Sequence, residues 1–498
     1  MLYMNWIARS LVAFSLLCFA QGVWAQKGYD IKVKLKDYKN DTCILGYRLG
    51  DKTYVKDTAI GRNDQGYFEF KKDTLLEKGV YLILTKPTNS YFEFLVPSDE
   101  EQKLTIETND EGGNWVKNLK IKGSEDNTAF VDYLHFLSKQ AEKNREMQTR
   151  LQELQKELDE MQGQGPKKAK LQAEKEALEQ KMKTLNGEVT AYQEKMIKER
   201  PNYLSTKLIL ASRQPEVPES IAGDRTQAYY YFKKHYWDDF DFGDMRLIRT
   251  PVFQQKLDFY CDKLTVQDPD SVNASVDFIL GNIIKAGDKD MYQFAAAHLL
   301  NRYANSKVIC MDNVYYHIGS KYYCGAEKPD WVDQEQLKKI CENVEDLRYS
   351  LCGEKAQDIK LTNIKTGLPV SLYGLKKRFV AVYFWDPSCG NCSKNSKKLV
   401  PVYEKWKDKG FEIYGICSKN IDDVDACKKK IKELGMNWIN TSDKAYPLAL
   451  TKKLYNVKVN PFVYLLDQEK NILYKRLDPE QIDQILTRAA EEEAKEKG

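Results

Sequence analysis

Cys389 and Cys392 are the one cysteine pair of this chain whose spacing is diagnostic of chemistry. They lie between residues 379–385, a run that is apolar on both faces, and a following stretch with helical periodicity. A C-x-x-C pair at the start of a helix can close a small ring disulfide. Free amide NH groups and the positive end of the helix dipole favour the thiolate of the first cysteine. Cys389 is therefore predicted to attack a disulfide, and Cys392 is predicted to resolve the mixed disulfide that forms.

Zinc binding and a purely structural bridge are the two other uses of such a pair. A zinc site needs two further ligands, and Cys417 and Cys427 are not in ligand spacing with each other. The histidines all lie outside the carboxy-terminal domain, at His135, His235, His298 and His317. A structural bridge is disfavoured because a C-x-x-C disulfide at a helix start is strained and reducible. The sequence therefore predicts no metal and no cofactor.

The elements that must position this pair are predicted within residues 353–498. A hairpin over 359–372 precedes the buried strand 379–385. Further strands are expected at 411–417, 462–466 and 472–475, and helices at 393–409, at 422–434 and from 479 onward. Strands that alternate with helices predict an α/β domain with a parallel sheet covered on both faces.

The segment from about Ala356 to Ala490 resembles the TlpA-like branch of the thioredoxin superfamily. The resemblance rests on Phe384-Trp385 before the first cysteine, on the hairpin end at 370–372 and on residues 454–467. It implies a thioredoxin-like fold, thiol-disulfide oxidoreductase activity and a redox-active disulfide between Cys389 and Cys392. It further implies that Pro461 is a cis proline facing the cysteine pair. Substrate contacts are then expected from Trp385, Asn460 and Pro461, with the backbone of Asn460 pairing with an extended chain.

Five positions depart from the pattern of that family. Ser388 stands where Trp is common, Gly390-Asn391 replaces a Pro-containing pair, and Phe462 replaces the usual Thr after the proline. Tyr383 occupies the position of the buried carboxylate of thioredoxin, so proton transfer at Cys392 must use water or another group. These differences leave the redox potential and the direction of exchange open.

The front of the chain is predicted to hold three accessory regions. Residues 26–125 alternate with period two in seven short segments, which predicts an all-β, sandwich-like domain for binding or scaffolding. Residues 126–200 carry two apolar seams around the break at 163–166, which indicates either an antiparallel helical hairpin or a dimeric coiled coil. Residues 201–352 are predicted to be α-helical, with an aromatic run from Tyr229 to Phe242 that forms core or lines a groove.

Export is predicted by residues 1–25, in which Arg9 precedes an apolar run and Ala25 closes a cleavage site. We therefore expect a periplasmic or other extracytoplasmic protein, with membrane association left open. Cleavage removes Cys18 and leaves ten of the eleven cysteines in a compartment that permits disulfides. Apart from the C-x-x-C pair, most of these cysteines are expected to be buried thiols. A structural bridge, such as one between Cys310 and Cys324, is the alternative.

Charge and motif together give the expected function. The balance of 77 basic and 73 acidic residues, a net charge of +4, gives no reason to expect a nucleic-acid partner. The first hypothesis is thiol-disulfide exchange with exported proteins, as a reductant or isomerase, with a membrane thiol reductase as the electron donor that the resemblance implies. The alternative is a non-catalytic binding or assembly protein that uses the thioredoxin fold for recognition. A peroxidase is disfavoured because Asp386 stands where that pattern needs Thr or Ser.

Overall fold

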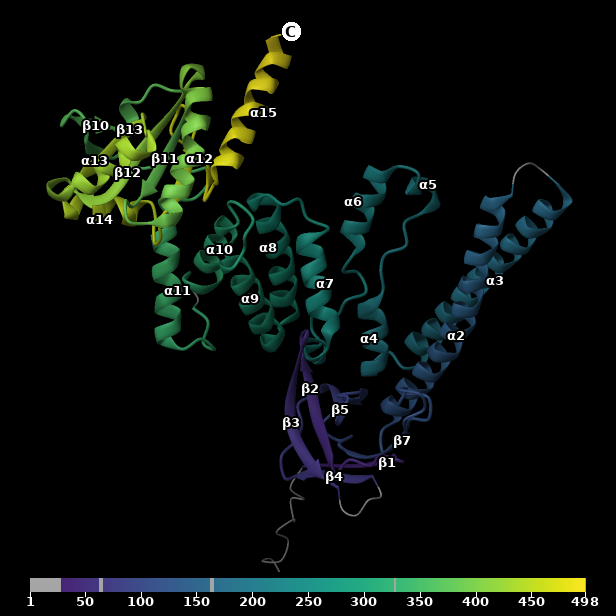
Figure 1. The fold of residues 1–498 in the computed structure, drawn as a ribbon. Helices are drawn as coiled ribbons and strands as arrows, with labels where there is room; N and C mark the ends of the chain where they lie inside the picture. Colours follow the sequence, from purple (N-terminus) through teal and green to yellow (C-terminus); the bar gives the residue numbers. More distant parts are fainter. Residues whose placement is uncertain (1–27, 62–65, 162–164, 327, 498) are drawn as a thin grey trace, which may run out of the picture. The chain divides into compact units, whose positions relative to one another are not determined.

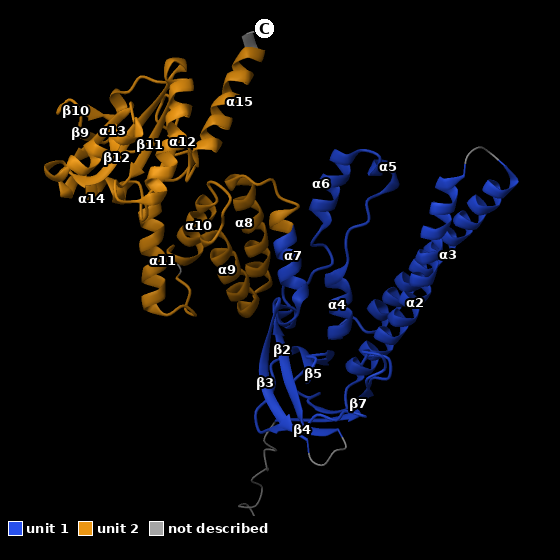
Figure 2. Cartoon of the chain, viewed as in Figure 1, with its two compact units in different colours: residues 1–259 blue, residues 260–498 orange. Residues whose placement is uncertain are grey.

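The computed structural model describes residues 28–61, 66–161, 165–326 and 328–497 (Figure 1). The predicted signal peptide, residues 1–25, lies outside them. The chain divides into two compact units, residues 1–259 and 260–498 (Figure 2). The boundary falls inside helix α7 (Pro251–Asp262), within the region that the sequence suggests as one helical domain.

The first unit begins with a β-sandwich, as predicted. Its strands form two four-stranded sheets, in the orders β4-β1-β7-β8 and β3-β2-β5-β6. Alternate residues of β1, Ile31, Val33 and Leu35, are fully buried in a core that both sheets share. The strands are β1 (Tyr29–Lys36), β2 (Thr42–Leu49), β3 (Lys52–Ile60), β4 (Tyr67–Lys72), β5 (Gly79–Thr85), β6 (Tyr91–Val96), β7 (Lys103–Asn109) and β8 (Lys120–Lys122). The eighth strand was not predicted, because three residues are too few to show a period of two.

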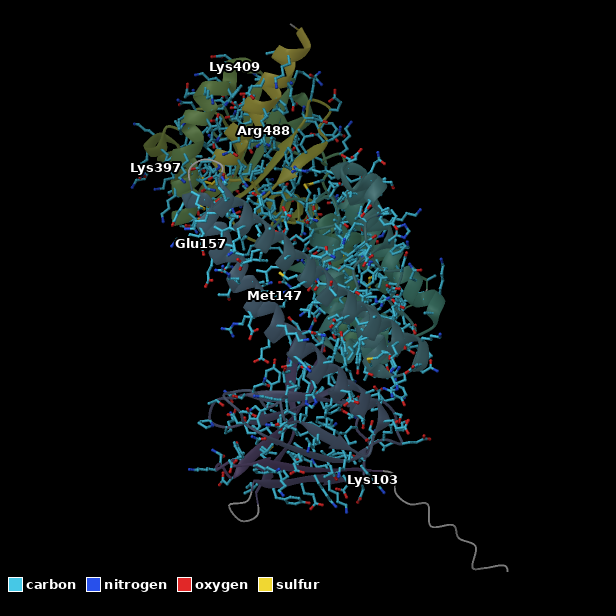
Figure 3. The ribbon with its side chains drawn as sticks, turned by 90° about the vertical axis from the view of Figure 1, so that its right-hand side faces the viewer. Lys103, Met147, Glu157, Lys397, Lys409 and Arg488 are labelled. Atoms are coloured by element: carbon cyan, nitrogen blue, oxygen red, sulfur yellow. A yellow bond between two sulfur atoms is a disulfide. The ribbon has the colours of Figure 1, made fainter. Side chains whose placement is uncertain are left out.

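The sandwich leads into a long hairpin of two helices, α2 (Glu125–Glu160) and α3 (Pro166–Glu199), which pack against each other within one chain. Seam residues such as Leu154 and Leu185 are buried, and Arg150 of α2 forms an ion pair with Glu174 of α3 at 2.9 Å. Glu157, a residue of α2, is labelled in Figure 3. Each helix covers the apolar seam of the other, so the chain forms the antiparallel hairpin that was one of the two predicted arrangements. Dimerisation through a coiled coil stays a prediction.

Short helices complete the first unit: α4 (Leu204–Ser212), α5 (Glu219–Ala222), α6 (Arg225–His235) and the first residues of α7. The carboxylate of Asp126 accepts hydrogen bonds from the NH groups of Leu204 and Ser205 at 2.6 and 3.1 Å, which fixes the start of α4 to the base of the hairpin. Trp237 and Phe240 of the aromatic run are only 5% and 6% exposed. This part of the run therefore forms core and does not line a groove.

The second unit opens with a helical region, α8 (Pro269–Ala286), α9 (Lys289–Ala304), α10 (Asp312–Ile318) and α11 (Gln334–Leu347). Two disulfides tie it together, Cys324–Cys341 and Cys310–Cys352. The suggested Cys310–Cys324 bridge is wrong. Helix α10 and the π-helical turn that follows it separate Cys310 from Cys324, and each cysteine meets a partner that the packing of other segments brings near.

The thioredoxin-like domain follows, with a seven-stranded sheet in the order β10-β9-β13-β12-β11-β14-β15. Only β11, β12 and β13 are parallel neighbours, and every other pairing is antiparallel, so the sheet is mixed and not the parallel one expected. Its strands are β9 (Lys360–Asn363), β10 (Pro369–Ser371), β11 (Phe379–Trp385), β12 (Phe411–Asn420), β13 (Ile439–Asp443), β14 (Phe462–Leu466) and β15 (Ile472–Lys475). Its helices are α12 (Gly390–Trp406), α13 (Asp425–Leu434), α14 (Ala445–Leu454) and α15 (Pro479–Lys497).

Both faces of this sheet are covered, as predicted. Helices α12, α13 and α15 contribute to the core on one face, while α14 contributes to the core on the other. Exposed side chains such as Lys397 of α12 and Arg488 of α15 are labelled in Figure 3. Strand β13 and helix α14 were not predicted. The polar residues of β13 hide its burial in the sequence, since Thr441 is fully buried with its hydroxyl donating to the Gly415 carbonyl at 2.9 Å. No helix in the described ranges has the length and apolar character that crossing a bilayer requires.

Candidate active site

The cysteine pair lies where β11 ends and α12 begins. The helix begins at Gly390, three residues earlier than predicted, and Cys389 is its N-cap. The NH of Cys392 donates a hydrogen bond to the Cys389 sulfur at 3.1 Å. A negative charge on this sulfur is stabilised by that NH and by the positive end of the helix dipole. The two sulfurs are not joined in this structure.

The two sulfurs have different surroundings. Cys389 is partly exposed, whereas Cys392 is 1% exposed and belongs to the domain core. Burial raises the pKa of the Cys392 thiol to about 12, and the neighbouring Cys389 adds to the rise. Cys392 is therefore a protonated thiol at neutral pH. An incoming disulfide reaches Cys389 first.

Tyr383 occupies the buried position below the pair. It is fully buried, and its hydroxyl donates a hydrogen bond to the Cys392 carbonyl at 3.1 Å and lies 3.0 Å from the Ser396 hydroxyl. Burial raises the pKa of Tyr383 above its usual range. The phenol thus stays protonated and cannot take a proton from Cys392 as a carboxylate would.

Asp386 is a site residue that the sequence reasoning did not assign. Its carboxylate accepts hydrogen bonds from the Ser388 NH at 2.8 Å and from the hydroxyls of Ser388 and Ser418, and Lys419 lies 3.5 Å away. Burial by itself raises the pKa of Asp386, but these hydrogen bonds outweigh it and lower the pKa to about 2. The carboxylate therefore stays ionised, and its negative charge near Cys392 disfavours the thiolate form of that cysteine. The sequence pattern Asp386-x-Ser388 could have indicated this role, because an Asp side chain commonly accepts a hydrogen bond from the NH group two residues later and so forms an Asx turn.

The loop before β14 faces the cysteine pair. The Asn460–Pro461 peptide bond is cis, as the resemblance implied. Strands β14 and β11 are antiparallel with Phe462 opposite Phe384, so the loop before β14 lies beside the end of β11. The Asn460 carbonyl oxygen is 3.7 Å from the Cys389 sulfur. The structure therefore brings together Cys389, Cys392, Asn460 and Pro461.

Trp385 is the one residue predicted to contact substrate whose side chain the structure buries. Its side chain is 1% exposed and lies in the core beneath the helices. As the last residue of β11, in register with Cys417 of β12, it supports the strand end from which the cysteine loop departs. Direct contact of this side chain with a substrate is excluded by its burial.

A third disulfide, Cys417–Cys427, lies in the same core as Cys392 and joins the end of β12 to α13. The expectation that most cysteines outside the C-x-x-C pair are buried thiols is therefore wrong. Three bridges use six of them, and their sequence separations of 10, 17 and 42 residues carry no recognisable spacing.

Three family models match three successive segments of the chain. Residues 352–475 match the AhpC/TSA family. Two domains of unknown function match the front, DUF4369 over residues 29–130 and DUF5106 over residues 170–350.

Individual relatives match part of the chain. The thiol-disulfide oxidoreductase ResA of Bacillus cereus is 25% identical over 138 residues, which are 27% of this chain and 73% of that protein. The structure of a thioredoxin-like protein from Bacteroides caccae is 22% identical with a TM-score of 0.44, and the match covers 55% of this chain and 97% of the other. The thioredoxin domain of a thiol-disulfide oxidoreductase from Bacteroides vulgatus is 28% identical with a TM-score of 0.26, over 28% and 96% of the two chains.

The fold and the cysteine geometry thus define a thioredoxin-like domain with a C-x-x-C pair at a helix start. Residues 352–475 of this domain match the AhpC/TSA family, the chain is similar to thiol-disulfide oxidoreductases named ResA, and accessory domains precede the matched segment. The resemblance stated from the sequence is confirmed, and the relatives support thiol-disulfide exchange as the chemistry.

Proposed function

We propose that this chain catalyses thiol-disulfide exchange on exported proteins, with Cys389 attacking and Cys392 resolving. The difference between the two sulfurs carries this proposal. Cys389 is accessible and accepts an NH hydrogen bond at a helix start, whereas Cys392 is buried with its pKa raised to about 12. Only the first is equipped to attack a disulfide from solution.

The reaction balances within the pair and its substrate. The Cys389 thiolate attacks one sulfur of the substrate disulfide, forms a mixed disulfide and releases the other substrate sulfur as a thiolate. Cys392 then loses its proton and attacks the Cys389 sulfur, which closes the Cys389–Cys392 disulfide and releases the second substrate thiolate. Two electrons pass from the chain to the substrate. A thiol reductant must restore the pair, and a membrane thiol reductase is the donor we propose.

The direction of exchange is proposed as reduction or isomerisation. No histidine stands between the two cysteines, where a positive charge would over-stabilise the Cys389 thiolate and make the site a strong oxidant. The Asp386 carboxylate adds a negative charge near Cys392, which disfavours the thiolate of that resolving cysteine. We place the protein in the periplasm or another extracytoplasmic compartment because residues 1–25 are predicted to be a signal peptide.

Reduction of insulin by the full chain, with dithiothreitol as the terminal reductant, tests the proposal. Turnover by the wild type and its loss in Cys389→Ser support it. Turnover that equals the uncatalysed rate overturns it and favours the alternative, a binding protein that uses the thioredoxin fold for recognition. Cys43→Ser is a suitable control, because this buried thiol lies in the β-sandwich of the other compact unit.

A further inference from the structure

A pocket of about 790 Å³ lies beside the cis proline, within the second compact unit. The thioredoxin-like domain forms one wall, with the loop 456–463, the end of β15 and Asn395 of α12. The helical region forms the other wall, with the segment 303–315 and one face of α11. An accessory region thus contributes to a cavity next to the redox pair.

The pocket begins next to the residue whose carbonyl faces Cys389. Pro461 lines the pocket, and the residue before it, Asn460, has its carbonyl oxygen 3.7 Å from the Cys389 sulfur. Asn395 lines it as well and follows Cys392 by three residues on α12. A chain whose cysteine reacts at Cys389 and which runs across Pro461 therefore enters this pocket with its next residues.

Unpaired positive charge distinguishes the pocket. Lys307, Lys458 and Arg476 line it, and none of the three has a carboxylate partner in the described part of the chain. Among the described residues, Lys458 donates to the neutral side chain of Asn343, at 3.0 Å.

Two acidic groups, Asp312 and Asp478, line the pocket together with a fourth basic side chain, Lys475. Asp312 pairs with Lys475 at 2.6 Å, and Asp478 accepts a hydrogen bond from the Gln481 NH at 2.8 Å at the start of α15. The Asp478 carboxylate keeps its charge, so four basic and two acidic side chains leave the lining with a net charge of +2. An apolar surface is present beside it, since Val459, which lines the pocket, is 70% exposed.

We propose that this pocket binds an acidic, extended segment next to the reactive cysteine of the substrate, so that the helical region takes part in substrate selection. The inference rests on the proposed exchange activity and adds the substrate class. Opposite charge in a cleft raises the rate of productive encounter, which is why the effect is expected in kcat/KM and in its salt dependence.

Two short peptides with one internal disulfide test it, identical except that the residues on one side of the cysteine are Asp and Glu in one and Asn and Gln in the other. The reduced full chain transfers two electrons to either peptide and becomes the Cys389–Cys392 disulfide. At low ionic strength the wild type is expected to reduce the acidic peptide about tenfold faster. High salt should remove this preference, because exposed charges are screened.

The combined variant Lys307→Gln, Lys458→Gln, Arg476→Gln is expected to lose the preference and to keep the rate on the neutral peptide within about twofold. The matched control removes three charges from the same unit away from the pocket, by Lys365→Gln, Lys429→Gln and Lys432→Gln, all exposed, and should keep it.

A salt-insensitive rate with no preference in the wild type overturns the pocket inference, even if the triple variant does not fold. So does a preference that survives in a folded triple variant. In both cases the proposed exchange activity stands. A wild type that reduces neither peptide nor insulin overturns the exchange activity and the inference with it.

Discussion

The hydroxyl of Tyr383 donates a hydrogen bond to the carbonyl oxygen of Cys392 at 3.1 Å, in the position where thioredoxin carries a buried carboxylate. Because burial raises the pKa of this phenol, it holds the backbone of α12 in place and moves no proton. The resolving thiol must therefore exchange its proton with water or a substrate group.

Replacing Tyr383 by Phe removes this hydrogen bond and is expected to lower the free energy of unfolding by about 1 to 2 kcal/mol, because the Cys392 carbonyl loses its side-chain donor in a buried position. The rate of insulin reduction should change by less than about threefold, and its pH profile should keep its shape. Chemical denaturation and a pH series check both. A shifted pH profile would instead make the phenol a proton carrier.

The two cysteine variants are expected to fail in different ways. Cys389→Ser should form no mixed disulfide, because the accessible sulfur is gone. Cys392→Ser should attack once and remain attached to its substrate, since nothing resolves the intermediate. Non-reducing gel electrophoresis after mixing with oxidised insulin shows the trapped species. Equal trapping by both variants would reverse the assigned roles.

Asp386→Asn tests the hydrogen-bonded carboxylate through the pH dependence of stability. The pKa of Asp386 is lowered to about 2 in the folded chain, so its contribution is present above the unfolded value of about 4 and is lost as the pH falls through about 2. We expect the variant to be less stable by about 1 to 2 kcal/mol at pH 7, after allowance for partial exposure.

Denaturation curves of both chains at pH 7 and at the lowest pH at which the wild type stays folded measure this contribution. The difference between the chains should shrink at acid pH. A difference that is independent of pH would mean that the loss comes from packing, and that the charge of Asp386 contributes nothing.

The ion pair of Lys475 with Asp312 predicts a large effect on stability. Lys475 is 2% exposed, and its ammonium group lies 2.6 Å from the carboxylate and also donates to the Ser350 carbonyl. Asp312→Asn should destabilise the second unit by about 3 kcal/mol, because it leaves a buried charge without its partner. Glu335→Gln, which breaks an exposed pair with Lys339, is the matched control and should cost less than about 0.5 kcal/mol. Equal effects in thermal unfolding would contradict the burial of the pair.

The sequence by itself located the chemistry of this protein. A cysteine pair between an apolar strand and a helix is a local pattern, and the period of two or of 3.6 residues marks most strands and helices because each element buries one face or both. For the same reason the β-sandwich, the two long helices with their apolar seams and the two-sided sheet could be expected, while polar β13 and the three-residue β8 could not.

Only the tertiary structure decided which distant residues meet. Pro461 could be paired with Cys389 from the sequence through resemblance alone, and the structure supplies the reason in the pairing of β11 with β14. The partners of Cys310 and Cys324 depend on how helices pack, which no spacing encodes. Trp385 has the residue type of a contact residue, yet the sheet and its helices enclose it. Local periodicity indicates which face of a helix or strand is buried, whereas only the tertiary structure shows which other elements pack against that face.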